Sequence, residues 1–381
     1  MKKTISVILC AAMLLCVLLP AAIAATPAEE AKLHFNSDGK FKIMQFADIQ
    51  DDVVLSAASA SFIKKTVKSE SPDLIVLSGD NIGGYSTQNK TLTKTAINSY
   101  MKIFESLGVP VAIVFGNHDD QDNGTTKEWQ MEVYNSYSVD ISYDEGPDID
   151  GCGTYNVPIL SSDGSKVAFN VWMFDSGTYE EGYGYDHVHA NQIEWYKNTS
   201  NALKEANGGE PVYSIAFQHI IVGEIFDALK EVEPGTEGAI EHGGKYYVLP
   251  DGNEGSLGET PCPGGRNEGQ FAAFVEQGDV LATVSGHDHV NDFIIPYEGV
   301  DIINTPTCGF SSYGNEETRG ARVFVIDEND TSKYETYVVR CADLMPQSAD
   351  SAAVYNLAVF FRKIGAFFED LWDKIKGVFG A

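Results

Sequence analysis

The stretch from Val111 to Asp119 has the sequence VAIVFGNHD, an apolar run that stops abruptly at four polar or small residues. A continuous apolar run of this length, rich in β-branched residues, is typical of a strand that is buried on both faces of a sheet. The tetrapeptide from Gly116 to Asp119 would then lie at the end of that strand, where ligands of layered α/β proteins bind. The stretch therefore predicts an α/β fold with a polar site at one sheet edge.

Other segments on both sides of this stretch repeat its pattern. Apolar runs that stop at a polar residue occupy 43–47, 74–77, 212–217 and 280–284. Helical patterns separate them, at 56–68, at 93–107 before Gly108, at 191–206 and at 270–277. A closing group of strands is expected at 300–304, 321–326 and 334–339. Alternating strands and helices predict one layered α/β domain over residues 31–345.

Three further segments are less regular. The turn-forming cluster Asn36 to Gly39 predicts an opening hairpin between 32–35 and 41–46. Glycine, proline and acidic residues are frequent in 143–184 and 233–269. These two segments are expected to form long surface loops over the site or irregular β excursions.

Both ends of the chain have compositions of their own. Residues 1–24 combine two lysines, an apolar run and small residues at Ala22 and Ala24, which predicts a cleavable secretory signal and a secreted or cell-surface protein. Within 350–381, apolar residues recur at alternating steps of three and four, which predicts an amphipathic helix. That helix would pack on the domain or attach reversibly to a membrane or partner surface.

The formal net charge of -29 disfavours nucleic-acid binding, because such a surface repels polyanions. Export would permit two disulfides, in three possible connectivities, and buried thiols are the alternative. The cysteines outside the predicted signal are Cys152, Cys262, Cys308 and Cys341.

Five short motifs at the ends of predicted strands supply side chains that bind metals. Oxygen and imidazole ligands without thiolates suit Mn, Fe or Zn better than Mg or Ca. Two ions close together can hold the attacking and leaving oxygens of a phosphoryl displacement, and Asp80 is the natural carboxylate to bridge them. The motifs are Asp48-Ile49-Gln50, Gly79-Asp80-Asn81, Gly116-Asn117-His118-Asp119, Gln218-His219 and Gly286-His287-Asp288-His289.

In this order the motifs resemble those of the calcineurin-like metallophosphoesterase superfamily, D-x-H, G-D, G-N-H-D, H and G-H-x-H, over residues 41–325. The longer phrases at 114–119, 174–177 and 286–292 more narrowly resemble its purple acid phosphatase-like branch. The resemblance implies a four-layer α/β/β/α sandwich and a metal-bound hydroxide as nucleophile. It also implies the metal ligands: Asp48 and His289 for the first ion, Asn117, His219 and His287 for the second, and Asp80 for both.

The resemblance implies that His118 is the acid that protonates the leaving oxygen, and that Asp119 orients it. Gln50 stands where the common pattern has histidine. Its amide carbonyl is a weaker and harder donor, so Gln50 as a ligand favours Mn²⁺ at the first position. Gly83 stands where the purple enzymes have a tyrosine ligand, so no iron–tyrosinate colour is expected.

Several other polar residues admit two interpretations. His187 and His189 could touch substrate, although an H-x-H before a helix is more typical of a polar loop. Tyr313 and Arg319 could meet phosphate, although an arginine paired with a carboxylate is the simpler expectation. Asp288 is expected to be solvated or to support a ligand.

The sequence therefore predicts a secreted metal-dependent phosphatase or phosphoesterase, with two divalent ions and a small phosphoester substrate. One alternative is a nucleotide pyrophosphatase or phosphodiesterase. Another is a non-catalytic metal-binding surface protein attached through the C-terminal helix. His118 argues against the latter, because a binding protein has no use for an acid beside the metals.

Overall fold

The computed structural model describes residues 25–121 and 124–345. The predicted secretory signal, residues 1–24, and the predicted C-terminal helix, residues 350–381, lie outside the described residues. A short helix, α2 (Pro27–Ala31), opens the described part and is capped by Thr26.

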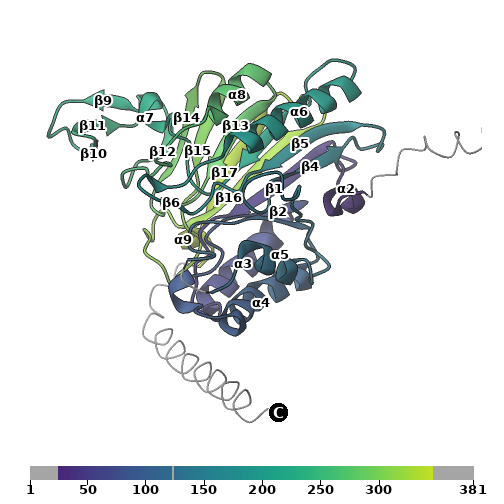
Figure 1. The fold of residues 1–381 in the computed structure, drawn as a ribbon, viewed down its shortest axis with the longest axis horizontal. Coiled ribbons are helices and arrows are strands. Elements are labelled where there is room, and N and C mark those ends of the chain that lie inside the picture. The colour runs from purple at the N-terminus through teal and green to yellow at the C-terminus, as the bar shows by residue number, and fades with distance from the viewer. Residues whose placement is uncertain (1–24, 122–123, 346–381) are drawn as a thin grey trace, which may run out of the picture.

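Two mixed sheets form the centre of the molecule (Figure 1). The smaller sheet has five strands in the order β17-β16-β1-β2-β3. β1 runs parallel to β2, and β2 parallel to β3, whereas β16 is antiparallel to β1. The strands are β1 (Lys40–Phe46), β2 (Leu74–Ser78), β3 (Val111–Val114), β16 (Gly320–Asp327) and β17 (Tyr334–Arg340).

The larger sheet has seven strands in the order β12-β14-β15-β13-β8-β5-β4. Its four central strands, β15, β13, β8 and β5, are mutually parallel, and antiparallel strands complete both edges. The strands are β4 (Tyr155–Leu160), β5 (Val167–Met173), β8 (Ser214–Phe217), β12 (Glu254–Ser256), β13 (Val280–Ser285), β14 (Asp292–Tyr297) and β15 (Val300–Asn304).

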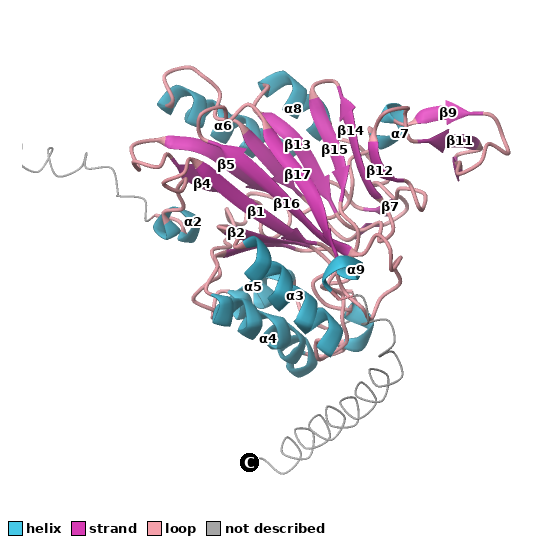
Figure 2. Ribbon diagram, turned by 180° about the vertical axis from the view of Figure 1, so that it is seen from behind, coloured by secondary structure: helices cyan, strands magenta, loops and turns pink. Residues whose placement is uncertain are grey.

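Helices cover the outer faces of both sheets (Figure 2). On the outer face of the five-stranded sheet lie α3 (Ala57–Glu70), α4 (Lys90–Leu107), α5 (Lys127–Tyr134) and α9 (Cys341–Leu344). On the outer face of the seven-stranded sheet lie α6 (Ala190–Ala206), α7 (Ile225–Ala228) and α8 (Gln270–Gln277). Small excursions complete the fold: β6 (Tyr179–Glu180), β7 (Gly184–Tyr185), β9 (Lys230–Val232), β10 (Ile240–His242), β11 (Lys245–Val248) and a 3-10 turn at Gly84–Ser86.

Three hydrophobic cores hold these layers together, because most strands are buried on both faces. Along β1, Ile43 lies in the core between the two sheets, and its neighbour Met44 lies in the core beneath α3 and α4. This is the two-residue alternation of a strand with apolar neighbours on each side. A third core lies between the seven-stranded sheet and its helices and contains Trp172 and Phe274.

The structure confirms the predicted α/β class and most of the predicted elements. Ser56 caps α3 through a hydrogen bond from the Ser59 amide, and Gly108 ends α4 in a left-handed conformation. The predicted opening hairpin is wrong. The turn exists, since the Asn36 amide donates to the Lys40 carbonyl, but the preceding arm bridges β4 through His34.

The composition of the segment 143–184 predicts loops or irregular β structure, yet the segment contains the edge strand β4 and its neighbour β5. Frequent glycine and acidic residues on both sides hide these strands in the sequence. All four described cysteines are free, and Cys152, Cys308 and Cys341 are buried. In the described part of the chain, no helix is both long and apolar enough to cross a membrane.

Candidate metal centre

The predicted site residues follow the ends of five strands, three from one sheet and two from the other. Asp48 and Gln50 follow β1, Asp80 follows β2 and the residues 117–119 follow β3. His219 follows β8, and His287 and His289 follow β13. All are buried except His118, whose side chain is 29% exposed. The centre therefore lies where the edges of the two sheets meet, with His118 on its solvent side.

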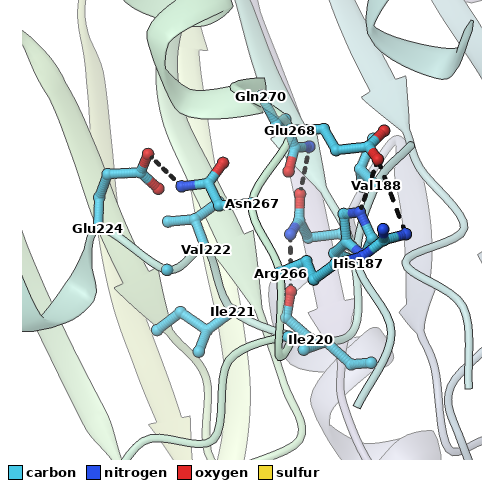
Figure 3. A pocket seen from close by; sticks show the side chains of 13 residues that line it. His187, Val188, Ile220, Ile221, Val222, Glu224, Arg266, Asn267, Glu268 and Gln270 are labelled. Atoms are coloured by element: carbon cyan, nitrogen blue, oxygen red, sulfur yellow. Dashed lines mark hydrogen bonds and ion pairs between the residues drawn. The ribbon is translucent and has the colours of Figure 1, made fainter. Parts of the chain in front are cut away.

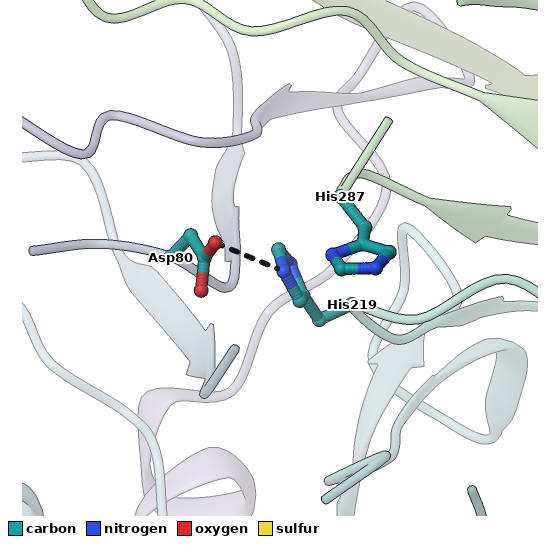
Figure 4. A group of neighbouring side chains, drawn as sticks. All are labelled: Asp80, His219 and His287. Carbon is teal, nitrogen blue, oxygen red and sulfur yellow. Dashed lines mark ion pairs between the residues drawn. The ribbon is translucent and has the colours of Figure 1, made fainter. Parts of the chain in front are cut away.

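The structure brings these side chains together in two groups, and Asp80 belongs to both. Asp80, His219 and His287 form one group (Figure 4), and Asp48, Asp80 and His289 form the other. Within each group, the ligand atoms lie within 4.8 Å of one another. His219 Nε2 is 3.3 Å from Asp80 Oδ2, and His289 Nε2 is 3.4 Å from Asp48 Oδ1. A carboxylate shared by two ions needs this arrangement.

Backbone carbonyls orient two of the histidines. His219 Nδ1 is 3.0 Å from the Ser78 carbonyl, and His289 Nδ1 is 2.9 Å from the Tyr313 carbonyl. Because a carbonyl oxygen only accepts, each Nδ1 carries the hydrogen and each Nε2 faces the aspartates. Histidines that bind metals are held in this way.

Some buried polar atoms at the centre have no hydrogen-bond partner among the residues that the structure describes. They are the Gln50 Oε1 and His287 Nε2 atoms. A buried acceptor without a partner costs about 1–3 kcal/mol unless a ligand satisfies it. Gln50 stays close to the centre, since its Nε2 donates to Asp80 Oδ2 at 3.4 Å.

The backbone is strained at the same place. Outside glycine, the described residues with positive φ include Asp48 (51°), Gln50 (32°), Asp80 (48°) and His287 (71°). Such conformations cost free energy and cluster at functional sites, where the surrounding structure enforces them. Gly79 permits the close approach of β2 to the other sheet, because a Cβ there would lie 2.6 Å from the His219 ring.

The charges and the burial of the candidate ligands shift the pKa values of His219 and His287 in opposite directions. Burial alone would lower the pKa of His219, but the charge of Asp80 outweighs it and raises this pKa to about 9. Burial, with repulsion from His219, lowers the pKa of His287 to about 3. A divalent ion that binds His219 would therefore displace a proton from it. His287 is neutral before any ion binds.

Asp119 accepts hydrogen bonds from backbone amides around the centre. Its Oδ2 accepts from the Gly116 amide at 2.6 Å, and its Oδ1 accepts from the Asn81 and Ile82 amides. Burial, then repulsion from Asp80, raises the pKa of Asp119 to about 8. Asp119 thus joins the loop that carries His118 to the loop that follows Asp80.

The donor set fits two divalent ions. It combines carboxylates, imidazoles and amides without thiolates, it is buried, and it contains acceptors without hydrogen-bond partners. Asn117 Oδ1 lies 3.2 Å from His219 Nε2, a spacing that two ligands of one ion also have. These features suit Mn, Fe or Zn rather than a calcium cage of oxygen ligands.

Sequence reasoning missed two tyrosines at the centre. The Tyr185 ring lies 4.4 Å from the His287 ring, and Asn117 Nδ2 donates to the Tyr179 hydroxyl at 3.4 Å. Both lie in a glycine-rich loop, and no motif marks them. The Tyr313 ring stacks on His289 at 4.1 Å, whereas Arg319 lies over Phe310.

Asp288 is buried and accepts a hydrogen bond from the Cys262 amide. The same side chain has a pKa raised well above its usual range by burial and then by repulsion from Glu259. The structure thus places it beside the centre, within the strand-end loop, and not in solvent.

Known phosphoesterases resemble this chain in sequence. The family model of the calcineurin-like phosphoesterases matches residues 41–291. "Probable inactive purple acid phosphatase 14" of Arabidopsis thaliana is 30% identical over 318 residues, which are 74% of each chain. "Phosphatase DCR2" of Saccharomyces cerevisiae is 27% identical over 290 residues, 69% of this chain and 46% of that protein. The crystal structure of a dimetal phosphatase from Danio rerio covers 78% of this chain and 98% of its own, with 13% identity and a TM-score of 0.49.

Proposed function

The chain belongs to the calcineurin-like phosphoesterase family, and from that premise we propose that it is a secreted hydrolase that cleaves small phosphoesters with two divalent metal ions. The observation that carries this proposal is the pair of buried ligand groups that share Asp80. Sharing one carboxylate keeps two ions close together. Ions about 3.5–4 Å apart can hold both the attacking and the leaving oxygen of one phosphate.

When bound, the ions would neutralise the charge of the phosphate and activate water as the nucleophile. Side chains of the protein would orient the substrate and protonate the leaving group. His118 is partly exposed, and its Nε2 lies 3.9 Å from Asp80 Oδ2, so it meets substrate that arrives from solvent. It donates the proton that the leaving alkoxide needs. Asp119 holds the loop that carries it.

A non-catalytic role deserves a test, because the Arabidopsis thaliana relative is named as probably inactive. In this chain both ligand groups contain carboxylate and imidazole donors. His118 also lies beside these groups, and a protein that only binds metals does not need an acid there. These two features favour catalysis.

A nucleotide pyrophosphatase or phosphodiesterase is a second candidate, favoured by exposed aromatic rings at the centre. Tyr179 is 49% exposed and Tyr313 is 57% exposed, and both contact site residues. Such rings can stack on a nucleobase. The acidic surface opposes bulky polyanions, so a small phosphoester remains the first choice.

The test is an assay of the purified full chain with Mn²⁺, Fe²⁺ or Zn²⁺ against a phosphomonoester, a phosphodiester and a nucleoside diphosphate ester. Asp80→Ala is the matched control, since it removes the ligand common to both groups and should abolish hydrolysis. We expect metal-dependent hydrolysis of the monoester. The proposal fails if the metal-loaded protein and Asp80→Ala show the same residual rate on every substrate.

A further inference from the structure

A second group of metal-binding side chains lies in the loop before α6, away from the centre built on Asp80. It consists of Asp186, His187 and His189, whose ligand atoms lie within 4.8 Å of one another. His189 Nε2 is 2.9 Å and His187 Nδ1 is 3.2 Å from the same oxygen, Asp186 Oδ1. Ligand atoms of a tetrahedral zinc ion, each about 2.0–2.2 Å from the metal, are about 3.3–3.6 Å apart. The three atoms are therefore close enough to surround a single ion.

The outer nitrogen of each histidine faces a different carboxylate. His189 Nδ1 is 2.8 Å from Asp150 Oδ2, and His187 Nε2 is 3.6 Å from Glu268 Oε1. Carboxylates behind the ligand histidines are a recurring feature of metal sites, because they fix the tautomer and raise ligand basicity. With its hydrogen on Nδ1, a neutral His189 turns the lone pair of Nε2 toward Asp186.

His187 supplies the independent observation. It is 8% exposed, and neither of its ring nitrogens makes a hydrogen bond within the described part of the chain. Yet carboxylates surround it, since Glu180 Oε2 is 3.8 Å from Nδ1 in addition to the contacts with Asp186 and Glu268. A buried imidazole that faces acceptors without bonding to them is poised for a cation.

The carboxylates around the cluster outnumber the arginine beside it, and this excess of negative charge favours a bound cation. Arg266 pairs with Glu180 through two contacts of 2.7 and 2.8 Å and lies 3.8 Å from Glu268. Figure 3 shows that the Glu268 carboxylate contacts both His187 and Arg266. One guanidinium is opposed by four carboxylates, those of Asp150, Glu180, Asp186 and Glu268.

We propose that Asp186, His187 and His189 bind a zinc-class divalent ion that holds the loop 177–189 in place over the metal centre. Two imidazoles and one carboxylate are a ligand set that suits zinc. The loop packs tightly here, because a Cβ on Gly177 would lie 2.3 Å from Asp186 Oδ2. The same loop carries Tyr185 to the His287 ring. The ion is thus structural, and its binding does not depend on the proposed hydrolysis.

The competing explanation is a cluster held by protons. Burial alone would lower the pKa of His189, but hydrogen bonds to Asp186 and Asp150 outweigh it and raise this pKa. Protonated histidines would then pair with the carboxylates without any metal. The two explanations differ in one measurable respect, the dependence of the cluster on zinc.

The first experiment is elemental analysis of the full chain after loading with Zn²⁺ and dialysis. The double variant His187→Gln, His189→Gln should retain one zinc ion fewer per chain than the unmodified protein. His34→Gln is the matched control, since His34 is exposed and its ring contacts the Phe35 carbonyl instead of a carboxylate. It should retain the full zinc content. Equal zinc content in all three proteins would overturn the proposal.

A second measurement avoids variants that fail to fold. Crystals of the unmodified protein with Zn²⁺ should give an anomalous peak at the zinc edge between Asp186 and His189. Zinc peaks at the Asp80 groups with none at this cluster would contradict the site. In the Asp80→Ala background, Zn²⁺ should still raise the unfolding temperature. No zinc-dependent shift would favour the protonated cluster, whatever the outcome of the hydrolysis assay.

Discussion

Gln50 is the residue at which this chain departs from the pattern of the metallophosphoesterases. Its Oε1 has no hydrogen-bond partner, its Nε2 donates to Asp80, and its φ is 32°. The Gln50 amide thus lies beside Asp80, with its carbonyl oxygen available to a ligand. A carbonyl carries no charge and is harder than imidazole, so it should hold Mn²⁺ in preference to Zn²⁺, and loosely.

Gln50→His should tighten the first metal position, because imidazole is the stronger ligand. We expect the Mn²⁺ concentration for half-maximal activity to fall by about tenfold. The measurement is a titration of activity against free Mn²⁺ for both proteins, with Gln50→Ala as a control that should shift the midpoint upward. Three superimposable curves would show that Gln50 is not a ligand.

His118→Asn should lower kcat by about 10²–10⁴ on an alkyl phosphate, because the leaving alkoxide then has no proton donor. A phenolic ester with a good leaving group needs that proton less and should lose less activity. Metal content should not change, since His118 belongs to neither ligand group. Equal losses on both esters would assign His118 to phosphate binding instead of proton transfer.

At the scale of the elements, the loops beside the strands contain partly buried ionisable residues, and Asp140 is one of them. Asp140 bridges to Val111, the first residue of β3, and lies among buried neighbours. Its Oδ1 accepts from the Ser142 hydroxyl at 2.8 Å, and Ser142 Oγ accepts from the Ile113 amide. Burial raises the pKa of Asp140 to about 7.

This shift should make stability fall as pH rises. In the unfolded chain Asp140 ionises near its ordinary pKa of 3.8, whereas the folded state keeps it protonated to about pH 7. Between these values the unfolded state has released more protons, so the free energy of unfolding decreases, by an amount on the order of a few kcal/mol. An asparagine does not ionise, so Asp140→Asn should remove this decrease in the free energy of unfolding. The substitution should therefore stabilise the protein more at pH 7.5 than at pH 4.5.

Thermal unfolding of Asp140→Asn and the unmodified protein at both pH values checks the prediction. Asp163→Asn is a control of opposite sign, because hydrogen bonds from Ser161 and Ser165 lower the pKa of Asp163 to about 2. Loss of that carboxylate should not stabilise the protein at the higher pH. A benefit of Asp140→Asn that is the same at both pH values would mean that Asp140 is ionised in the folded state.

At the scale of the molecule, the metal centre connects the two sheets. The candidate ligands follow β1, β2 and β3 on one side and β8 and β13 on the other. Bound ions would therefore stabilise the docking of the sheets as well as the site. Asp48 and Asp80 are buried carboxylates that need this compensating charge.

Chelation of the metals should accordingly lower the unfolding temperature of the whole domain. One ion at a hundred times its Kd contributes about 2.7 kcal/mol to the free energy of unfolding. Calorimetry with EDTA, followed by excess Mn²⁺, should show a fall and a recovery. Asp80→Ala should respond less to Mn²⁺ than the unmodified protein does. If EDTA leaves the unfolding temperature of the unmodified protein unchanged, the sheets dock without metals.

The predicted helix within 350–381 leads to a prediction about the full chain. Its apolar face needs a cover, so truncation after Asp350 should lower the unfolding temperature if the helix packs on the domain, which is the expected outcome. Liposome binding and activity are measured in parallel. Lost liposome binding with unchanged stability and activity would assign the segment to membrane attachment instead.

Much of this protein follows from local sequence. The run from Val111 to Phe115 and its counterparts predicted the strands, because burial on both faces requires unbroken apolar residues. Motifs after these runs predicted the donors, because parallel strands place their ends at one sheet edge. Chain order alone therefore indicated the family, the donor types and the edge where they gather.

Packing between distant segments supplied the rest. Which sheets meet, which histidine nitrogen faces Asp80, and which tyrosine packs on His287 depend on contacts between residues far apart in the chain. β4 and β5 were missed because their flanks resemble loops, and their neighbours in the sheet make them strands. The sequence around His187 and His189 is typical of a polar loop, because two of the four carboxylates beside them, those of Asp150 and Glu268, come from distant parts of the chain. Periodicity records only near neighbours along the chain, whereas a site depends on neighbours in space.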